Sequence, residues 1–411
     1  MKQKQFIAGK SYIPTSGQEI SDNDKVHLRE VVDSGWYTDG RKCTEFRNIL
    51  HIINAKKHVM LTNSGSSASL VAISAMTERV HRPFKYILTC ATGFPTTVAP
   101  IYQTGHVPIY VDINPENLQP DRNQTFDMKL KYGTDIGFVV MAHTLGFPFY
   151  EAYFANSLPL ISDCCDALGS KIDGKPVGYK ADISTLSFFP AHHITTGQGG
   201  AVLTDDAELR KICDSYIHWG RDCYCEPGQN NTCGMRFDKT TGTDLPLGWD
   251  HKYRFERLGY NLQMTEFQAA LGVSQAMILD EFTKKRQEHY AKLLNGLFVF
   301  NEYISFVSFP EWSKPSPFGF PILVRDTAPF SLTELVEYLE VNRVGTRRVF
   351  GGNLTRQPAF KNLYHVKAGD LSGSDKVMND MFWIGCHPAL TNEMLDYVIS
   401  VFDAFFKSRG L

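Results

Sequence analysis

Short apolar runs alternate with longer amphipathic stretches along most of this chain. The runs at 58–62, 86–89, 107–111, 137–141 and 159–162 have the character of buried strands, and the stretches between them favour helices. This alternation predicts an α/β fold with a mainly parallel sheet that is covered on both faces. Such sheets bind ligands at the carboxyl ends of their strands, so residues that follow a strand are the first candidates for a site.

The remaining periodic stretches complete the expected organisation. We predict helices over 22–34, 44–54, 68–76, 206–216, 265–294, 332–341 and 392–406, and further strands over 184–188, 200–204 and 318–324. The helix over 265–294 is long enough to link two domains. We therefore expect an N-terminal arm and large domain over 1–280, which includes a cysteine-rich loop at 220–234, and a small C-terminal α/β domain over 281–411.

The polar loop between the strands 184–188 and 200–204 is the strongest candidate for a pocket. It carries His192 and His193, two threonines and three glycines. Glycines allow a backbone to approach a ligand closely, and imidazoles and hydroxyls suit an anionic ligand. A tight connection with surface histidines is the alternative.

Two further stretches have the chemistry of a site. The small residues 63–69 lie between a strand and a helix start, where free amides and the helix dipole form a seat for phosphate; a plain N-cap is the alternative. Asp163 ends a buried strand, and a carboxylate there needs a partner. A protonated ring nitrogen of a cofactor would be such a partner.

The loop at 220–234 contains Cys223, Cys225 and Cys233 but few apolar residues that could bury them. Thiols in such a loop favour a metal site. The spacing is CxC, then seven residues and a third cysteine. It matches neither the paired CxxC of zinc ribbons nor a common ferredoxin pattern.

Composition excludes several classes of function. Of 411 residues, 43% are hydrophobic and 21% are charged, and the formal net charge of -2 gives no basis for binding nucleic acid or an anionic membrane surface. No segment has the length of uninterrupted apolar sequence that a spanning helix needs, and the N-terminal residues lack the apolar core of a signal peptide. We expect a cytoplasmic protein whose nine cysteines are not in disulfides.

The loop over 184–204 resembles the lysine loop of the sugar aminotransferases of the DegT/DnrJ/EryC family, which hold pyridoxal phosphate (PLP). In that family a lysine follows the serine, here Ser187, by five positions, and this position is His192. The sequence Pro-Ala-His-His at 190–193 is similar to that of the 3-dehydrases, a branch that uses pyridoxamine phosphate (PMP). The resemblance covers nearly the whole chain and implies the fold type I of PLP-dependent transferases, which is that of aspartate aminotransferase.

The resemblance also implies roles for individual residues. The catalytic residue would be His192. Gly65 and Ser66 would hold the cofactor phosphate, Phe94 would stack on the pyridine ring, and Asp163 would pair with the ring nitrogen. The remaining cofactor-binding candidates are Asp166 near the ring, Ser187, and Asn261, which in relatives reaches the phosphate of the neighbouring subunit in a homodimer.

The replacement of lysine has a chemical consequence. An imidazole cannot form a stable Schiff base with the cofactor aldehyde, so the cofactor would be held without a covalent bond and could remain an amine. Histidine, with an ordinary pKa near 6.5, can take up a proton at neutral pH and return it. This chemistry favours elimination of a leaving group over ordinary transamination.

The cysteine spacing, taken with Cys165, resembles the [2Fe-2S] ligand set of the 3-dehydrases that act on CDP-4-keto-6-deoxyglucose. The ligands would be Cys165, Cys223, Cys225 and Cys233. The implied function is PMP-dependent removal of the C3 hydroxyl from a nucleotide-linked 4-keto-6-deoxyhexose. Electrons would come from a separate NAD(P)H-dependent reductase, and the product would enter 3,6-dideoxyhexose synthesis for lipopolysaccharide O-antigen.

Alternatives remain open at this point. A dehydratase of the GDP-4-keto-6-deoxymannose type shares the histidine and needs no cluster, a non-catalytic PLP-fold binding protein would turn over no ketosugar, and zinc could occupy the same cysteines. The pair Arg347 and Arg348 could bind a diphosphate, although such a pair is more often a solvated strand edge. Phe189 and Gln198 stand where relatives have tyrosine and glutamate.

Overall fold

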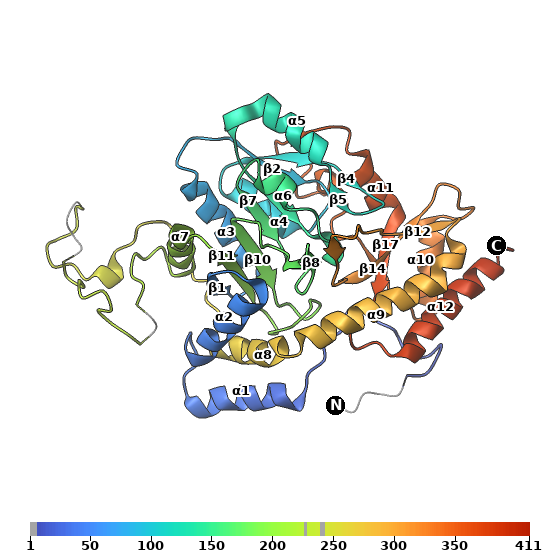
Figure 1. Ribbon diagram of the computed structural model, residues 1–411, viewed down its shortest axis with the longest axis horizontal. Helices are drawn as coiled ribbons and strands as arrows, with labels where there is room; N and C mark the ends of the chain where they lie inside the picture. Colours follow the sequence, from blue (N-terminus) through green and yellow to red (C-terminus); the bar gives the residue numbers. More distant parts are fainter. Residues whose placement is uncertain (1–5, 226–227, 239–242) are drawn as a thin grey trace.

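The computed structural model describes residues 6–225, 228–238 and 243–411. The first five residues of the predicted N-terminal arm, and residues 226 and 227 of the predicted cysteine-rich loop, lie outside the described residues. The centre of the molecule is an eight-stranded sheet with the order β1-β11-β10-β7-β6-β2-β3-β16 (Figure 1). Its strands are β1 (His58–Thr62), β2 (Tyr86–Cys90), β3 (Val107–Val111), β6 (Ile136–Ala142), β7 (Leu160–Asp163), β10 (Ile183–Ser187), β11 (Gly200–Thr204) and β16 (Val366–Lys367).

All pairs in this sheet are parallel except those of β11, which runs antiparallel to both β1 and β10. The predicted α/β class with a mainly parallel sheet is therefore confirmed. The β10–β11 pair corresponds to the strand, loop and strand predicted around His192.

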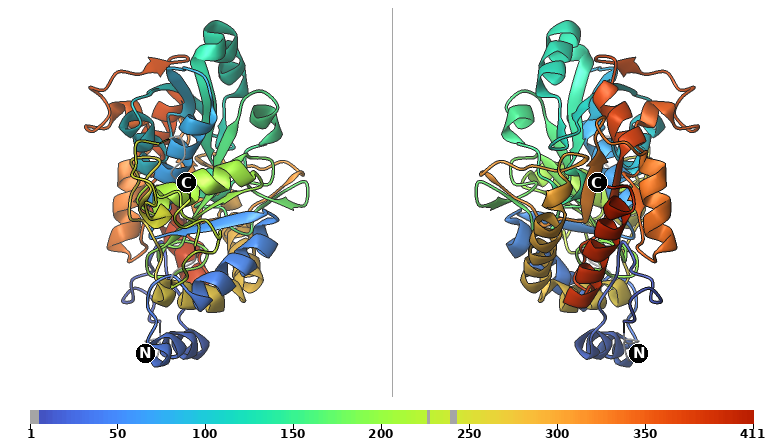
Figure 2. Two further views of the ribbon diagram at one scale, coloured as in Figure 1. Left: turned by 90° about the vertical axis from the view of Figure 1, so that its left-hand side faces the viewer. Right: turned by 90° about the vertical axis from the view of Figure 1, so that its right-hand side faces the viewer.

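Alternate residues of each central strand pack on opposite faces of the sheet. On β6, Phe138 and Val140 belong to a core with α3 (Gly65–Arg79), α4 (Pro95–Gln103) and α7 (Ala207–Ile217). Val139 and Met141 belong to the opposite core, which α9 (Leu279–Leu297) helps to cover. Farther along that face, α2 (Arg41–Asn54) and α8 (Glu266–Ala276) pack on β1, β10 and β11. The layers are visible from both sides in Figure 2.

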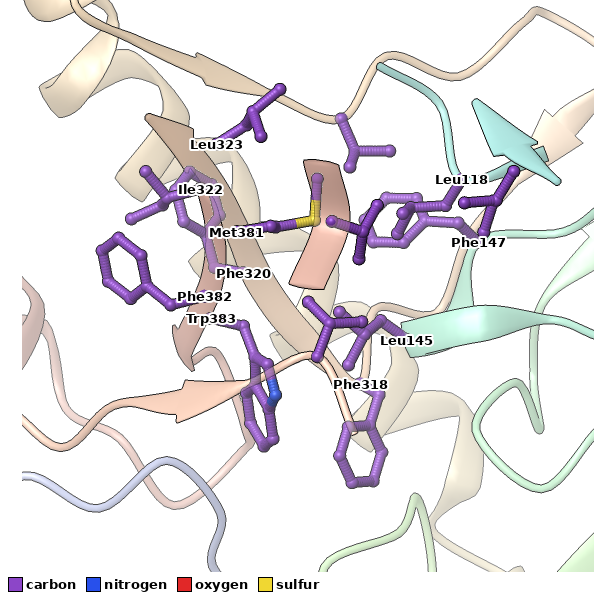
Figure 3. Packing of buried hydrophobic residues seen from close by; sticks show 14 of the residues in the cluster. Leu118, Leu145, Phe147, Phe318, Phe320, Ile322, Leu323, Met381, Phe382 and Trp383 are labelled. Carbon is purple, nitrogen blue, oxygen red and sulfur yellow. The ribbon is translucent and has the colours of Figure 1, made fainter. Parts of the chain in front are cut away.

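A second sheet has the order β12-β14-β17-β15 and is antiparallel throughout. Its strands are β12 (Ile304–Phe306), β14 (Gly319–Val324), β15 (Arg347–Arg348) and β17 (Met381–Gly385), and α10 (Leu332–Val341) and α12 (Asn392–Lys407) accompany it. Figure 3 shows how Phe320 and Met381 of this sheet share one apolar cluster with Leu145 and Phe147 from the segment after β6. The two sheets therefore share one core.

The single helix predicted over 265–294 is wrong: the chain forms α8 and α9, which are separated at Met277 and Ile278. Ile278 has φ -109° and ψ 11°, outside the helical region, which redirects the chain. The break lets α8 pack on α1 (Asp22–Ser34) and α2 while α9 packs on α12.

The remaining elements are short or peripheral. They are α5 (Arg122–Tyr132), α6 (Ala152–Ala155), α11 (Ser372–Asp380), β4 (Ile113–Asn114), β5 (Gln119–Pro120), β8 (Lys171–Ile172), β9 (Lys175–Pro176) and β13 (Ser313–Lys314). Within the described ranges, every helix is too short or too polar to cross a lipid bilayer.

Candidate active site

A cavity of about 720 Å³ lies where the carboxyl ends of β1, β2, β6, β7 and β10 face the second sheet. The N-terminal arm contributes Thr15 and Ser16 to its wall, and the second sheet and the segment before it contribute Phe318 and Trp383. Figure 3 shows these two aromatic side chains in the apolar cluster. The residues on its wall include eight of the predicted site residues: Gly65, Ser66, Phe94, Asp163, Cys165, Asp166, Ser187 and His192. Asn261 and three of the predicted metal ligands are not on this wall.

The start of α3 forms one end of the cavity. Ser64 caps this helix by accepting a hydrogen bond from the Ser67 amide at 3.1 Å, and the first-turn amides of Gly65 and Ser66 lack partners within the helix. A Cβ on Gly65 would lie 2.5 Å from Cβ of Ser187, so only glycine permits this close packing against β10. The arrangement offers free amides and the positive end of a helix dipole to an anion.

Asp163 ends β7 and is nearly buried. Its carboxylate accepts hydrogen bonds from the Thr97 hydroxyl at 2.6 Å and from the Cys165 amide at 3.1 Å. Thr97 was absent from the predicted site. It lies in the first turn of α4, three residues after Phe94, and only the fold brings α4 beside β7.

His192 and Asp166 face each other across one corner of the cavity. His192 Nδ1 lies 3.6 Å from Asp166 Oδ1, and each side chain is 15% exposed. Burial raises the pKa of Asp166 to about 8, with a further contribution from the charge of Asp163. Burial lowers the pKa of His192 to about 3, and the nearby Arg286 cation acts in the same direction. At neutral pH the imidazole of His192 is therefore uncharged.

The two adjacent histidines diverge. His193 is 2% exposed and its Nε2 lies 2.8 Å from the carbonyl oxygen of Ser316, away from the cavity wall. His192 stays at the cavity because its amide bonds back to the carbonyl of Phe189 at 2.9 Å and its ring packs 5.2 Å from that of Phe318. Of the two, His192 alone lines the cavity.

Arg347 and Arg348, which the sequence left open, also lie on the cavity wall. They form the two-residue strand β15 at the edge of the second sheet, and both are exposed. Their side chains add positive charge to the cavity wall. A basic pair at a strand edge is the signal in the sequence, but only the packing of the second sheet shows which surface it faces.

The predicted metal ligands are divided between two places. Cys165 lies on the cavity wall, whereas Cys223, Cys225 and Cys233 line a small hollow with His251. The segment that contains this hollow extends to the side of the molecule beyond α7 (Figure 1). Within residues 6–225, 228–238 and 243–411, the four sulfurs do not meet as one ligand group.

The thiols in the hollow have polar partners. The Thr232 amide lies 3.4 Å from Cys225 Sγ, and hydrogen bonding holds the pKa of Cys225 below its ordinary value although burial acts against this. Cys233 Sγ lies 3.8 Å from His251 Nδ1, and His251 Nε2 lies 2.9 Å from Asp222 Oδ2. The hollow therefore brings together three of the four predicted metal ligands. The other five cysteines, Cys43, Cys90, Cys164, Cys213 and Cys386, are buried.

Asn261 is exposed, and its backbone forms a bridge with His218. Its side-chain oxygen accepts a hydrogen bond from Gln263 at 3.4 Å. Its expected contact with a neighbouring subunit stays a prediction.

A buried polar network supports the strand ends beneath the cavity. Glu151 Oε1 lies 3.0 Å from both His143 Nε2 and Ser162 Oγ, and the His143 amide donates to the carbonyl of Asp163 at 3.0 Å. The Phe149 amide donates to His143 Nδ1 at 3.1 Å, so the proton of this imidazole is on Nε2. Since each ring nitrogen already has a partner, the network is structural.

Comparison with known proteins shows the family of the chain. The profile of the DegT/DnrJ/EryC1/StrS aminotransferase family matches residues 18–403. The chain is 43% identical to the lipopolysaccharide biosynthesis protein RfbH of Salmonella typhimurium over 98% of this chain and 94% of the relative. It is 41% identical to the dTDP-4-dehydro-2,6-dideoxy-D-glucose 3-dehydratase of Saccharopolyspora spinosa over 96% of this chain and 86% of the relative.

Among solved structures, E coli GDP-4-keto-6-deoxy-D-mannose-3-dehydratase with bound hydrated PLP superimposes with a TM-score of 0.84. The match covers 95% of this chain and 99% of that one at 21% identity, which supports the fold. The predicted fold type I of PLP-dependent transferases is thus confirmed.

Proposed function

The chain belongs to the DegT/DnrJ/EryC1/StrS aminotransferase family, and from this premise we propose that it is a PMP-dependent 3-dehydratase of a nucleotide-linked 4-keto-6-deoxyhexose. One observation carries the proposal. His192 lines the cavity beside Asp166, and among the described residues no lysine lies on the cavity wall. A cofactor bound there has no amine with which to form a covalent link to the chain.

The residues on the wall suit PMP. The first-turn amides of α3 at Gly65 and Ser66 would hold the phosphate, and Asp163 would pair with the ring nitrogen. Phe94, which is 51% exposed, would lie against the ring. Ser187 and Asp166 complete the wall around it. When bound, PMP supplies an amine that condenses with a ketone, and a ring that accepts electrons.

His192 would be the residue that takes up a proton during the reaction and returns it. Its imidazole is uncharged at neutral pH, lies at the cavity wall, and has no hydrogen-bond partner for Nδ1 among the described residues. It can therefore accept a proton at a ring nitrogen and return it. The ring of Phe318 packs 5.2 Å from the imidazole, which is 15% exposed.

We propose CDP-4-keto-6-deoxyglucose as the substrate, with the product entering 3,6-dideoxyhexose synthesis for a surface polysaccharide. The name of the Salmonella relative, a lipopolysaccharide biosynthesis protein, supports this setting. The Saccharopolyspora relative is named for a dTDP sugar, so the base must be determined by experiment. Incubation of the protein and PMP with the CDP, dTDP and GDP 4-ketosugars in the presence of a chemical reductant such as dithionite, followed by mass spectrometry, identifies the accepted nucleotide. No change in any of the three would refute the proposal.

We also propose that Cys165, Cys223, Cys225 and Cys233 hold a [2Fe-2S] cluster that a separate NAD(P)H-dependent reductase supplies with electrons. The spacing of the cysteines and the grouping of three of them in one hollow support this. The cluster requires the three sulfurs of the hollow to meet that of Cys165. Iron and sulfide analysis after anaerobic reconstitution tests whether the chain binds this cluster. Iron near zero favours the GDP-4-keto-6-deoxymannose type of dehydratase, and zinc favours a structural metal.

The assembly we propose is a homodimer, with a large domain over 1–280 and a small domain over 281–411. Large apolar side chains stand exposed along the segment that leads to Asn261, among them Trp219, Phe237, Trp249 and Phe255. Large exposed apolar side chains are typical of a protein interface. Sedimentation of the purified protein as a monomer would contradict the assembly.

A further inference from the structure

Arg286 is a fully buried cation that has no carboxylate partner. It lies in the middle of α9 and is 0% exposed, and within the described ranges no carboxylate oxygen comes within ion-pair distance of it. An isolated charge in such a place is costly unless polar groups replace water around it. The groups that surround Arg286 should therefore explain why the chain keeps it there.

Backbone carbonyls take the place of water. Nη1 donates to the carbonyls of Pro317 and Phe318 at 3.0 and 3.1 Å, and Nη2 donates to the carbonyl of His192 at 3.2 Å. One guanidinium thus joins the loop after β10 to the segment that enters β14. A planar fork of donors can hold two chain segments in one geometry, which a lysine ammonium does less well.

Both segments contribute to the cavity. His192 and Phe318 are on its wall, and their rings pack 5.2 Å apart. We infer that Arg286 is the positioning residue of this site: by holding the two backbones together, it fixes the His192 imidazole between Phe318 and Asp166. The inference rests on the proposed role of His192 and identifies the group through which α9 acts on it.

The charge of Arg286 also affects His192. After burial, the cation is the second cause of the lowered pKa of His192. The cation therefore disfavours the protonated form of the imidazole. Asp166, His193 and Arg286 are the titratable groups that interact with His192 in the described part of the chain.

A covalent readout at position 192 tests the inference without the dehydration assay. His192→Lys gives the chain an amine at this position, and its reaction with PLP produces the visible absorbance of the lysine adduct. We expect His192→Lys with Arg286→Met to form this adduct about 10- to 100-fold more slowly than His192→Lys alone, because the reacting group is no longer held in place. His192→Lys with Arg286→Lys should lie between the two.

Arg82 provides the matched control. It also donates to two backbone carbonyls, those of Thr134 and Ile136, but it is exposed and does not line the cavity. His192→Lys with Arg82→Met should react within about twofold of His192→Lys. Circular dichroism verifies that each variant is folded.

The outcomes separate two failures. If His192→Lys alone forms no adduct, the placement of His192 and hence the proposed function is wrong. If His192→Lys forms the adduct and Arg286→Met reacts equally fast, the inference about Arg286 is overturned. Where Arg286→Met does not fold, Arg286→Lys decides, and an unchanged rate in that variant overturns the inference. In the otherwise native chain, Arg286→Lys should lower kcat while KM for the sugar stays within about twofold.

Discussion

The buried carboxylate of Glu151 should be worth several kcal/mol to the stability of this fold. It is 1% exposed, and its two oxygens accept hydrogen bonds from four donors: the amides of Gly178 and Lys180, His143 Nε2 and Ser162 Oγ. Glu151→Gln keeps the shape of the side chain but replaces one oxygen with an NH₂ group. The amide of Lys180 would then face a second donor.

The magnitude follows from these contacts. One buried donor left without an acceptor costs about 1–3 kcal/mol, and each bond that changes from a charged to a neutral acceptor loses about 1 kcal/mol. The lower cost of burying a neutral amide offsets part of the total. We expect Glu151→Gln to lower the free energy of unfolding by about 3 kcal/mol at pH 7.

The pH dependence has a defined sign. Burial raises the pKa of Glu151, but hydrogen bonds from His143 and the two amides outweigh it and bring the pKa below the ordinary value. A carboxyl whose pKa is lowered in the folded state stabilises the fold above its unfolded pKa, about 4.3 for glutamate, and this stabilisation is lost as the pH falls through the folded pKa. The difference between native chain and variant should be constant from about pH 6 to 8 and smaller at about pH 4.

Urea unfolding at fixed protein concentration, followed by fluorescence and circular dichroism, measures the difference. Glu288→Gln is the matched control, because Glu288 is 59% exposed and lies 3.8 Å from Lys284, so its loss should cost at most about 0.5 kcal/mol. If the two variants have equal stability, or if the Glu151 difference does not change at acid pH, the reasoning is refuted.

Three further predictions concern the site. Thr97→Val removes the 2.6 Å hydrogen bond to Asp163 and should weaken PMP binding about tenfold, as measured by fluorescence titration. Unchanged affinity would show that the Thr97–Asp163 pair does not contribute to cofactor binding. Arg347→Gln, on the cavity wall, should raise KM for the nucleotide sugar about tenfold with kcat nearly unchanged, and an effect on kcat alone would contradict a role in substrate binding. Cys223→Ser should reduce the iron bound after reconstitution, whereas Cys213→Ser, in the buried face of α7, should not. Equal iron in both variants would show that the cysteine-rich loop does not bind the iron.

The strands of this fold were predictable because each is an apolar run bounded by polar residues. β1, β3 and β11 have the predicted bounds, as does the capped helix α10. The division between α8 and α9 was not predictable, since neither glycine nor proline marks it. It reflects packing of the two helices on different partners.

Part of the cavity wall was also predictable from the sequence. Gly65, Asp163 and His192 could be identified because each occupies a distinctive place after a strand or in a loop. Thr97 and Arg286 could not, because they act through residues distant in the sequence. Only the folded chain brings the hydroxyl to Asp163 and the guanidinium to His192.

The most direct test of the central claim follows hydrogen at the cofactor. The protein, PMP and the accepted nucleotide 4-ketosugar are mixed in D₂O, and the recovered PMP is analysed by mass spectrometry for deuterium at its aminomethyl carbon. We predict incorporation with the native chain and its loss in His192→Asn, since the imidazole is the group that exchanges this proton. Equal incorporation in both proteins would contradict the assignment of His192, and with it the account of the site.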